Sequence, residues 1–397
     1  MKAAHTLLKE DEAPLESPIT SHLETMAEKI LITGGAGFIG SHLADELLAH
    51  GYDVRVLDNL SPQVHTTKYR RPPYLHPEVE FMYGDICNAE VVRRVLLGVS
   101  AVFHLAAAVG VGQSMYQIGK YTNTNTFGTA VLLEALVERP VHRLVVASSM
   151  SIYGEGLYRA SDDSLQTPAE RGIEQLKAGV WEFHDAWGNM LAPVATPESK
   201  TPSLASIYAL SKYDQERMSM LIGRAYNIST VVLRFFNVFG IRQALSNPYT
   251  GVLAIFASRY VNNKPPLIFE DGHQKRDFVS VYDVAQACRL ALEVPDAAGH
   301  VVNIGSGRAY SILEVAKRMA RVLGKTHIKP HITGKYRAGD IRHCFADITR
   351  ARSVLGYTPR VTLEEGLVEL AEWLKGQAAQ DNVDAATGEL RKRGLTV

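Results

Sequence analysis

Residues 32–40 read Ile-Thr-Gly-Gly-Ala-Gly-Phe-Ile-Gly, and this stretch decides the fold. It places Gly34, Gly37 and Gly40 three residues apart, after an apolar run and before an amphipathic helical pattern. Glycine permits a tight strand-to-helix turn, close approach of the backbone to a pyrophosphate, and close packing of the helix on the strand. The start of the helix then offers free N–H groups to that pyrophosphate. The stretch therefore predicts a dinucleotide-binding turn.

Asp58 supports the same interpretation. It ends the next expected strand, 53–57, eighteen residues after Gly40. A carboxylate at this place accepts hydrogen bonds from the adenosine ribose and repels a 2′-phosphate. The sequence therefore favours NAD over NADP as the cofactor.

Short apolar segments alternate with amphipathic ones between about residues 29 and 149. This alternation is typical of an α/β fold with a doubly wound parallel sheet of the Rossmann type. A sixth strand is expected at 229–235, and after Gly240 the pattern loosens into Pro-rich loops. The expected strands of the first part are 29–33, 53–57, 79–82, 101–105 and 143–148, its helices are 38–50, 88–97 and 123–138, and the later elements are strands 267–269 and 301–304 and helices 283–293 and 311–323.

These patterns also divide the chain. We expect an NAD-binding Rossmann domain over 27–240, interrupted by an insertion at 155–205, and a smaller substrate-binding lobe mainly over 241–375. Residues 1–26 are polar and are expected to form a flexible extension. Residues 376–397 are expected to form a polar tail.

Composition narrows the classes of partner. Lysine plus arginine equals aspartate plus glutamate, at 42 each, so bulk charge points to neither a nucleic-acid nor a membrane partner. No apolar run approaches the length of a membrane span. Cys87, Cys288 and Cys344 are far apart and lack the spacing of metal ligands. We therefore expect no metal site and a location in the reducing cytoplasm.

Tyr208 and Lys212 stand one helical turn apart at the start of a helical stretch, so their side chains share a face. A tyrosine hydroxyl ordinarily has a pKa of about 10. A nearby ammonium, together with the positive nicotinamide of NAD, would favour the phenolate and make Tyr208 a base near neutral pH. Ser149 ends the fifth strand, at the edge of the sheet where ligands bind, and could orient the reacting hydroxyl. These three residues are the candidate catalytic set.

Several motifs in order give the chain a resemblance to the extended short-chain dehydrogenase/reductases, most closely to the nucleotide-sugar epimerases and dehydratases. The match covers about residues 29–375. The motifs that carry it are Gly-Gly-Ala-Gly-Phe-Ile-Gly (34–40), Asp-Asn-Leu-Ser (58–61), Gly-Asp-Ile (84–86), His-Leu-Ala-Ala (104–107), Ser-Ser-x-x-Ile-Tyr-Gly (148–154), Tyr-x-x-x-Lys (208–212) and Arg-Phe-Phe-Asn-Val-Phe-Gly (234–240).

The resemblance implies a set of ligand contacts. Asn125 would brace the active site, Asn237 would contact the sugar diphosphate, and Arg276 and Arg342 would clamp the phosphates, a task suited to planar guanidinium groups. The implied cofactor residues are Gly34, Gly37, Phe38, Ile39, Gly40, Asp58, Asn59, Asp85, Ile86, Leu105, Ala106, Ala107, Asn125, Tyr208 and Lys212, and the implied substrate residues are Ser149, Asn237, Val252, Arg276, Arg342 and Cys344.

The resemblance also implies a first step, removal of a hydride from the sugar, usually at C4, to leave a 4-keto sugar and NADH. Similar dehydratases and decarboxylases carry acids between the catalytic hydroxyl and the Tyr-Gly turn. Here Met150 and Ser151 stand at these places, and neither is an acid or a base. The simplest outcome is return of the hydride to the opposite face. We therefore expect an isomerase, an NAD-dependent nucleotide-sugar 4-epimerase.

The sugar is less well defined by the sequence. Cys344 stands where UDP-galactose 4-epimerases with a narrow pocket carry a tyrosine, which leaves room for a larger sugar, although a buried core cysteine explains it equally well. The insertion and the loop 242–252 resemble bacterial dTDP-L-rhamnose 4-epimerases, which would act on dTDP-L-rhamnose and dTDP-6-deoxy-L-talose. Trp181, Phe183 and Trp187 of the insertion could cover the sugar or pin the insertion to the protein's own surface.

Three alternatives stay open. The substrate could be UDP-N-acetylglucosamine or UDP-glucuronate, with the same 4-epimerase chemistry. The same three catalytic residues could also serve a 4-keto-sugar reductase, which Asp58 disfavours because such an enzyme would depend on NADP and consume its reduced form, NADPH. A regulatory NAD-sensing scaffold would be expected to lack part of the catalytic set.

Enzymes of this family pair through a four-helix bundle, so the resemblance also implies a homodimer. Its helices would be the one near 123–138 and the one that begins at Tyr208. The apolar stripes expected at the contact are Val131, Leu132, Ala135 and Leu136 on the first helix and Met218, Leu221 and Ile222 on the second.

Overall fold

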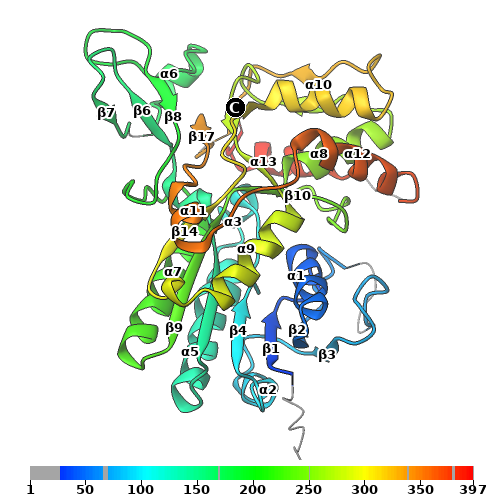
Figure 1. The fold of residues 1–397 in the computed structure, drawn as a ribbon. Coiled ribbons are helices and arrows are strands. Elements are labelled where there is room, and N and C mark those ends of the chain that lie inside the picture. The colour runs from blue at the N-terminus through cyan, green and yellow to red at the C-terminus, as the bar shows by residue number, and fades with distance from the viewer. Residues whose placement is uncertain are drawn as a thin grey trace, which may run out of the picture.

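The computed structural model describes residues 27–65, 70–168, 170–249, 251–337, 339–377 and 381–396. The extension 1–26, which the sequence predicts to be flexible, lies outside these residues. Figure 1 shows a central sheet flanked by helices, with the smaller elements gathered beyond one edge of that sheet. No helix among the described residues is long and apolar enough to span a membrane.

Seven parallel strands form the central sheet, in the order β14-β9-β5-β4-β1-β2-β3. They are β1 (Lys29–Thr33), β2 (Asp53–Asp58), β3 (Glu80–Tyr83), β4 (Ala101–His104), β5 (Arg143–Ser149), β9 (Ser229–Phe235) and β14 (Val301–Ile304). Because all neighbours are parallel, their carboxyl ends lie at one edge. The strand order reverses between β1 and β4, which is where such sheets bind ligands. The predicted Rossmann-type α/β fold is confirmed.

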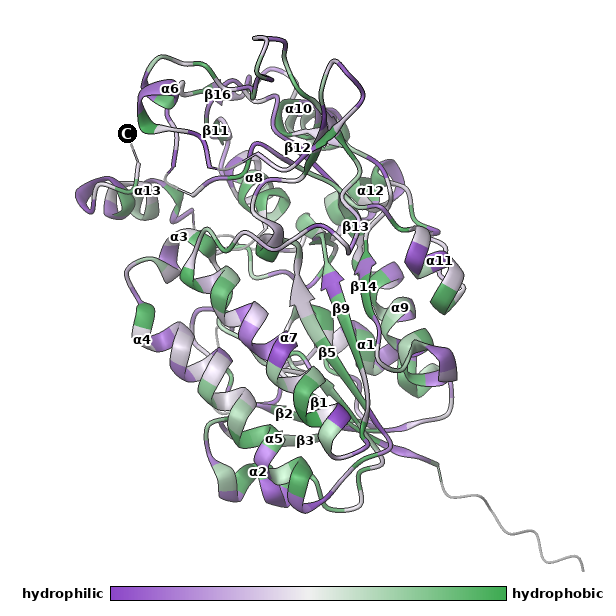
Figure 2. Ribbon diagram, turned by 90° about the vertical axis from the view of Figure 1, so that its left-hand side faces the viewer, coloured by the Kyte–Doolittle hydropathy of each residue, from purple (hydrophilic) through white to green (hydrophobic). Residues whose placement is uncertain are grey.

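Alternate side chains of the strands enter two separate cores, which explains why the inner strands carry apolar residues on both faces. In β1, Ile30 and Ile32 pack into one core and Leu31 into the other. Three helices cover the first core and three the second (Figure 2). They are α1 (Phe38–Ala49), α9 (Val281–Glu293) and α11 (Thr349–Leu355) on the first, and α2 (Ala89–Val95), α5 (Gly128–Glu138) and α7 (Ile207–Ala225) on the second.

The second half of the chain returns to the Rossmann domain. The segment 301–304, expected in the smaller lobe, is β14 and pairs in parallel with β9, with Val301 opposite Val232. Helix α9 packs beside α1, and its Cys288 lies in the same core as Leu43. The boundary expected near residue 240 therefore does not separate the two lobes along the chain.

The smaller lobe has a core of its own between three helices, α8 (Val252–Val261), α10 (Ile312–Val322) and α12 (Leu363–Leu374). Short strand pairs connect it to the sheet edge. They are β10 (Asn237–Phe239) with β13 (Phe278–Ser280), β11 (Leu267–Ile268) with β16 (His331–Ile332), and β12 (Lys275–Arg276) between β15 (Tyr310–Ser311) and β17 (His343–Cys344).

The insertion folds around a small three-stranded sheet, and its helix α6 (Ile173–Lys177) lies beside β11 and β16 of the smaller lobe in Figure 2. The strands of the insertion are β6 (Leu157–Arg159), β7 (Leu165–Gln166) and β8 (Ala192–Val194), with strand order β7-β6-β8. Phe183 packs edge-on against Tyr158, with ring centroids 5.3 Å apart, in a core shared with Leu191. Trp187, in contrast, is 69% exposed. The aromatic residues expected to cluster therefore do not share one environment. Phe183 packs in the insertion's own core, whereas Trp187 is exposed to solvent.

Two further expectations need correction. The segment 376–397, expected as a polar tail, contains α13 (Val383–Lys392), whose Ala386 and Leu390 lie one turn apart and are buried. The stripe expected to face a second copy on α5, represented by Leu132 and Leu136, is buried in the core beneath the sheet, with both side chains at most 1% exposed. The same core buries Val131 and Ala135, so this stripe is not a dimer surface.

Candidate active site

The glycine turn has the geometry that its sequence predicts. Gly34 has a φ of +70°, and a Cβ atom there would lie 2.8 Å from the backbone N of Ala106. A Cβ atom at Gly40 would lie 2.5 Å from the carbonyl oxygen of Gly34. Helix α1 begins after Gly37 without any side-chain cap, so the backbone N–H groups of Phe38 and its neighbours face the edge of the sheet uncapped. This is a cradle for a pyrophosphate, and it fits NAD.

Asp58 ends β2 beside this turn. Its carboxylate accepts hydrogen bonds from the backbone N of Ala36 at 3.1 Å and of Leu60 at 2.9 Å. Burial raises its pKa, while these hydrogen bonds and the neighbouring His65, whose Nε2 is 3.8 Å away, oppose the rise. Asp58 thus stabilises the glycine turn. It also lies at the position at which a ribose-binding carboxylate is expected.

The next strand ends place the other expected cofactor residues along the same edge. Asn59 donates to Asp85 at 2.9 Å, and Asp85 also accepts from the backbone N of Cys87. Ile86 is buried in the core under Gly128. Leu105, Ala106 and Ala107 follow β4 directly, on the other side of the glycine turn.

Asn125 lies in a π-helical turn, Thr122–Phe127, which precedes α5. Its side chain accepts from the backbone N of Ala108 at 2.7 Å and donates to the carbonyl oxygen of Ala108 at 3.0 Å. It also donates to Ser211 on α7 at 2.9 Å. Asn125 therefore ties the segment after β4 to α7, the helix that carries Tyr208 and Lys212, which is the arrangement that a brace requires.

Ser149, Tyr208 and Lys212 come together at this edge. Ser149 is the last residue of β5, and Tyr208 lies in the first turn of α7. Burial raises the pKa of Tyr208, and the neighbouring Ser149 hydroxyl opposes this rise with a smaller effect. The lowering that the sequence predicts for Tyr208 thus depends on the positive charge of bound NAD.

Lys212 is held by a buried polar network that the sequence reasoning missed. Its Nζ donates to Oε1 of Gln215 at 2.7 Å, and Nε2 of Gln215 donates to Thr129 at 2.8 Å. Gln215 also contacts Nε2 of His104, whose Nδ1 lies 2.8 Å from the Thr33 hydroxyl. Burial lowers the pKa of His104 to about 3 and that of Lys212 to about 7. The His-Leu-Ala-Ala motif marks His104, and helical spacing from Lys212 marks Gln215.

A second buried network fixes the turn after β5. Glu216 on α7 pairs with Arg234 on β9 at 2.6 Å and accepts from Ser148 at 3.0 Å. Arg234 donates to the hydroxyl of Tyr153 at 2.8 Å, and Tyr153 donates to Asn303 on β14 at 2.7 Å. Ser148, next to Ser149, and Glu216, one helical turn after Lys212, therefore hold strand, helix and turn together behind the candidate residues.

On the substrate side, the structure corrects the expected role of Arg342. Its side chain is 0% exposed and is saturated by carboxylates: Glu270 at 2.8 Å, Asp271 at 2.7 Å and Glu182 at 2.5 Å. Glu182 also accepts from His343 at 2.9 Å. Arg342 is therefore a buried hub that joins the insertion to the smaller lobe, and its guanidinium is not free to clamp phosphates.

Arg276 is the second arginine expected to bind the phosphates of the substrate, and it lies beside the segment 341–342. Its guanidinium donates to the backbone carbonyl oxygens of Ile341 and, at 3.0 Å, of Arg342. Asn237 begins β10 and keeps a buried side-chain oxygen without a partner among the described residues. Val252 begins α8. Cys344 is 1% exposed and lies in the first core of the Rossmann domain, with its Sγ 3.8 Å from the Thr196 hydroxyl. Cys344 thus has the contacts of a core cysteine.

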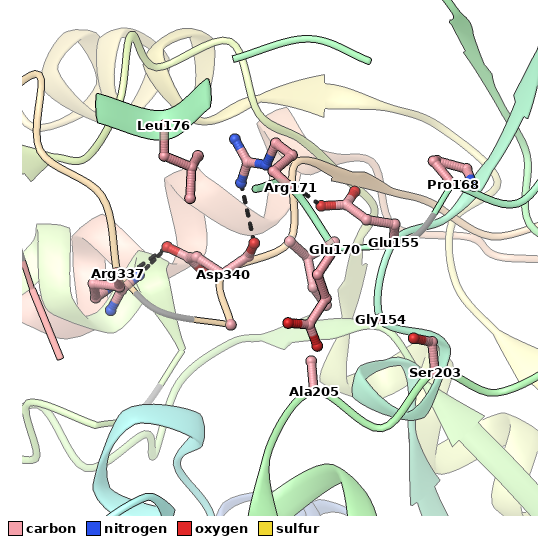
Figure 3. A pocket seen from close by; sticks show the side chains of 12 residues that line it. Gly154, Glu155, Pro168, Glu170, Arg171, Leu176, Ser203, Ala205, Arg337 and Asp340 are labelled. Atoms are coloured by element: carbon pink, nitrogen blue, oxygen red, sulfur yellow. Dashed lines mark hydrogen bonds and ion pairs between the residues drawn. The ribbon is translucent and has the colours of Figure 1, made fainter. Parts of the chain in front are cut away.

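A small pocket lies where the insertion meets the active-site edge (Figure 3). Arg337 lines it and pairs with Asp340 at 3.1 Å, with its guanidinium 4.5 Å above the ring of Phe269. The sequence reasoning passed over Arg337, although it stands five residues before Arg342. The complete lining is Gly154, Glu155, Pro168, Glu170, Arg171, Leu176, Ser203, Ala205, Arg337, Gly339, Asp340 and Ile341.

The charges of this pocket are mostly paired. Arg171 donates to Glu270 at 2.7 Å and to the carbonyl oxygen of Asp340 at 3.1 Å. Figure 3 shows the carboxylate of Glu170 pointing toward Ala205, just before the catalytic helix. The pocket holds about 40 Å³, room for a few water molecules and hence for one substituent of a sugar.

A Rossmann sheet, a glycine turn, and a serine, tyrosine and lysine at its carboxyl edge define an extended short-chain dehydrogenase/reductase. The family model for the NAD dependent epimerase/dehydratase family matches residues 30–172 and 188–305. The chain belongs to this family. Among the described residues there is no group of three or more metal-binding side chains.

Known proteins are similar over nearly their whole length. A dTDP-L-rhamnose 4-epimerase of Burkholderia thailandensis is 34% identical over 89% of this chain and 97% of its own. The solved UDP-glucose 4-epimerase of Thermotoga maritima, with UDP-glucose, is 32% identical, has a TM-score of 0.71, and is matched over 87% of this chain and 98% of its own. A UDP-glucuronic acid 4-epimerase of Bacillus cereus, in complex with UDP-glucuronic acid and NAD, is 28% identical, with a TM-score of 0.72 and coverage of 87% and 99%.

Proposed function

We propose that the protein is an NAD-dependent nucleotide-sugar 4-epimerase. The observation that carries the proposal is the meeting of Ser149, at the end of β5, with Tyr208 and Lys212 of α7 at the carboxyl edge of the sheet, where the glycine turn also lies. Ser149 would orient the C4 hydroxyl of the sugar, and Tyr208 would accept its proton and later return it. Lys212, held by Gln215, would supply positive charge near the phenol.

NAD would be held by the glycine turn and by Asp58, and when bound it supplies the oxidising and reducing power of the reaction. The protein's own residues decide the fate of the sugar once it is oxidised at C4. Met150 is buried in the core, and Glu155, a carboxylate just after the turn, is engaged by the backbone N of Arg342 at 2.7 Å and by the hydroxyl of Tyr158 at 2.9 Å. Met150 has no acidic or basic group, and the carboxylate of Glu155 is already engaged by two donors. The lack of a group that could promote elimination favours epimerisation over dehydration.

The experiment that tests this proposal is incubation of the purified protein with a panel of nucleotide sugars, followed by NMR. We expect interconversion of C4 epimers without net formation of NADH. Net consumption of NADPH with a 4-keto sugar would support the reductase instead. Loss of water from the sugar would support a dehydratase.

For the substrate, we propose dTDP-L-rhamnose and its C4 epimer dTDP-6-deoxy-L-talose. Similarity to the Burkholderia enzyme along nearly its whole length supports this choice. So does the small pocket beside Glu170, because a substituent as small as a methyl group suits its volume. UDP-glucuronate is the main alternative, supported by the Bacillus structure, and a free carboxylate at Glu170 would repel a uronic acid. UDP-N-acetylglucosamine stays in the panel.

We also propose a homodimer in the cytoplasm. Leu210 and Leu221 on α7 are 43% and 53% exposed, and Phe127 before α5 is 51% exposed. These side chains, rather than the buried stripe on α5, could pack against a second copy. The free cysteines Cys87, Cys288 and Cys344 suit a reducing compartment. Sedimentation at micromolar concentration tests the dimer, and a strictly monomeric mass would contradict it.

A further inference from the structure

The C-terminal segment 381–396 lies along the substrate side of the active site, although no step of the proposed reaction uses it. Figure 2 shows α13 directly above α3 (Val111–Ser114), a short helix of the Rossmann domain. The segment is amphipathic rather than merely polar, because Leu390 is only 5% exposed. Its contacts run from α8 to the pocket that Arg337 lines.

Its first residues are anchored in the smaller lobe. Arg259 on α8 donates to Asp381 at 3.1 Å and to Asp384 at 2.9 Å, and the side chains of Arg259 and Asp381 are 5% and 3% exposed. Asn382 donates to the carbonyl oxygen of Ser246 at 2.8 Å. A buried, hydrogen-bonded ion pair of this kind is costly to break, so the start of the segment is firmly placed.

The middle of the segment contacts the α3 region. Leu390 packs on Gly112, where a Cβ atom would lie only 3.3 Å from the leucine. The guanidinium of Arg393 lies 4.4 Å above the ring of Tyr116. The hydroxyl of Tyr116 shares a hydrogen bond of 2.6 Å with that of Tyr249, in the loop before α8. Arg393 therefore covers the point at which α3 and this loop meet.

The α3 region in turn holds the catalytic tyrosine. The hydroxyl of Ser114 accepts from the backbone N of Tyr208 at 3.0 Å, and Tyr121 packs edge-on against the ring of Tyr208 at 6.4 Å. At the other end of the segment, Thr396 forms an antiparallel bridge with Arg337 of the pocket. The segment thus touches the supports of both the base and the substrate pocket.

We propose that residues 381–396 form a strap that positions Tyr208 and the pocket loop, with Arg393 as a positioning residue. The proposal rests on the proposed epimerase function. A guanidinium over an exposed aromatic ring contributes about 0.5–1 kcal/mol. Loss of this contact frees Tyr116 and, through α3, loosens the support of Tyr208, while the glycine turn and Asp58 lie outside the strap's contacts.

The test compares Arg393→Ala with Arg393→Lys and with Lys392→Ala, an exposed neighbour that forms no ion pair within the described residues. We expect Arg393→Ala to lower kcat/KM about 2- to 5-fold, the effect of the energy given above. NAD content and Tm should stay unchanged. Arg393→Lys should restore most of the loss, because an ammonium also binds over the ring, and Lys392→Ala should behave as wild type.

Hydrogen exchange provides a readout that does not depend on turnover. The amide of Tyr208 should exchange faster in Arg393→Ala than in wild type, because its acceptor Ser114 is less firmly held. A chain ended after Gln377 should show a larger effect of the same kind. Unchanged exchange and kinetics in Arg393→Ala would overturn the strap. A wild-type protein without 4-epimerase turnover would instead contradict the proposed function, and the exchange measurement would still decide on the strap.

Discussion

Nζ of Lys212 donates a hydrogen bond of 2.7 Å to Oε1 of Gln215, three residues further along α7. Both side chains are buried, and Gln215 is fixed from its other end by Thr129 and His104. The lysine is therefore placed by the protein before any ligand binds. Its charge is costly at this position, because burial lowers the pKa of Lys212 to about 7.

This lowered pKa predicts how the stability of the NAD-free protein depends on pH. The unfolded chain keeps the lysine proton up to about pH 10.4, whereas the folded protein releases it above about pH 7. Between these values the unfolded state binds more protons, so the stability contributed at this site rises with pH. The free energy of unfolding in urea, wild type minus Lys212→Met, should increase from pH 7 to 9. A flat difference would show that Lys212 stays charged when folded.

Removal of the phenol tests the catalytic assignment. Tyr208→Phe should lower turnover roughly 100- to 10,000-fold, the usual range for a positioned acid or base. Affinity for the nucleotide sugar, measured by calorimetry, should change little, because the ring and its contact with Tyr121 remain. Ser149→Ala should act in the same direction but less severely. Near-normal turnover of Tyr208→Phe would mean that another group is the base.

Much of the fold, and the placement of Ser149, Tyr208 and Lys212 at one edge of the sheet, could be predicted from the sequence, because the information is local. Most sheet strands contain a short apolar run, and Tyr208 and Lys212 share a helix face whatever surrounds them. β14 could not be assigned to the sheet in this way, because a strand of three apolar residues and one asparagine does not reveal its partner. In α13 only Ala386 and Leu390 are buried, and two buried positions are too few to make a recognisable apolar stripe in the sequence.

The role of Arg342 depends on contacts distant in sequence. Its carboxylate partners Glu182 and Glu270 stand 160 and 72 residues away, so nothing near Arg342 shows that its charge is already neutralised. Gln215 and His104 were missed for a similar reason, since they meet only where α7 packs on the end of β4.

Substitution of Arg342 and, separately, of the pocket-lining Arg337 distinguishes a structural role from a role in binding. Arg342→Met should destabilise the protein by about 3–5 kcal/mol, because it removes the buried guanidinium from Asp271 and leaves Glu270 with Arg171 alone. Arg337→Met should leave the free energy of unfolding nearly unchanged, because Arg337 is 40% exposed. It should instead weaken nucleotide-sugar binding roughly 10- to 100-fold, the effect of one lost charged hydrogen bond. Calorimetry and urea unfolding of both variants check this, and the reverse pattern would restore Arg342 as the phosphate clamp.

The last prediction concerns the insertion. Its base must be kept, because Glu198 accepts from the backbone N of Asn303 and Lys200 donates to the carbonyl oxygen of Tyr153. Arg159 pairs with Ala192 across β6 and β8, so a short Gly-Ser turn in place of residues 161–190 can close that hairpin. The shortened protein should fold and retain NAD, because Arg342 keeps two of its three carboxylates.

The shortened protein should lose most sugar turnover or change its preference across the nucleotide-sugar panel. The excised residues include Pro168, Glu170, Arg171 and Leu176, which form one wall of the pocket beside Ala205. Trp187→Ala is the matched control, because this side chain is 69% exposed at the tip of the insertion and lines no part of that pocket. It should leave the kinetics unchanged. If the shortened protein also keeps wild-type kcat/KM for every sugar, the insertion takes no part in substrate recognition, and its aromatic residues serve only its own small core.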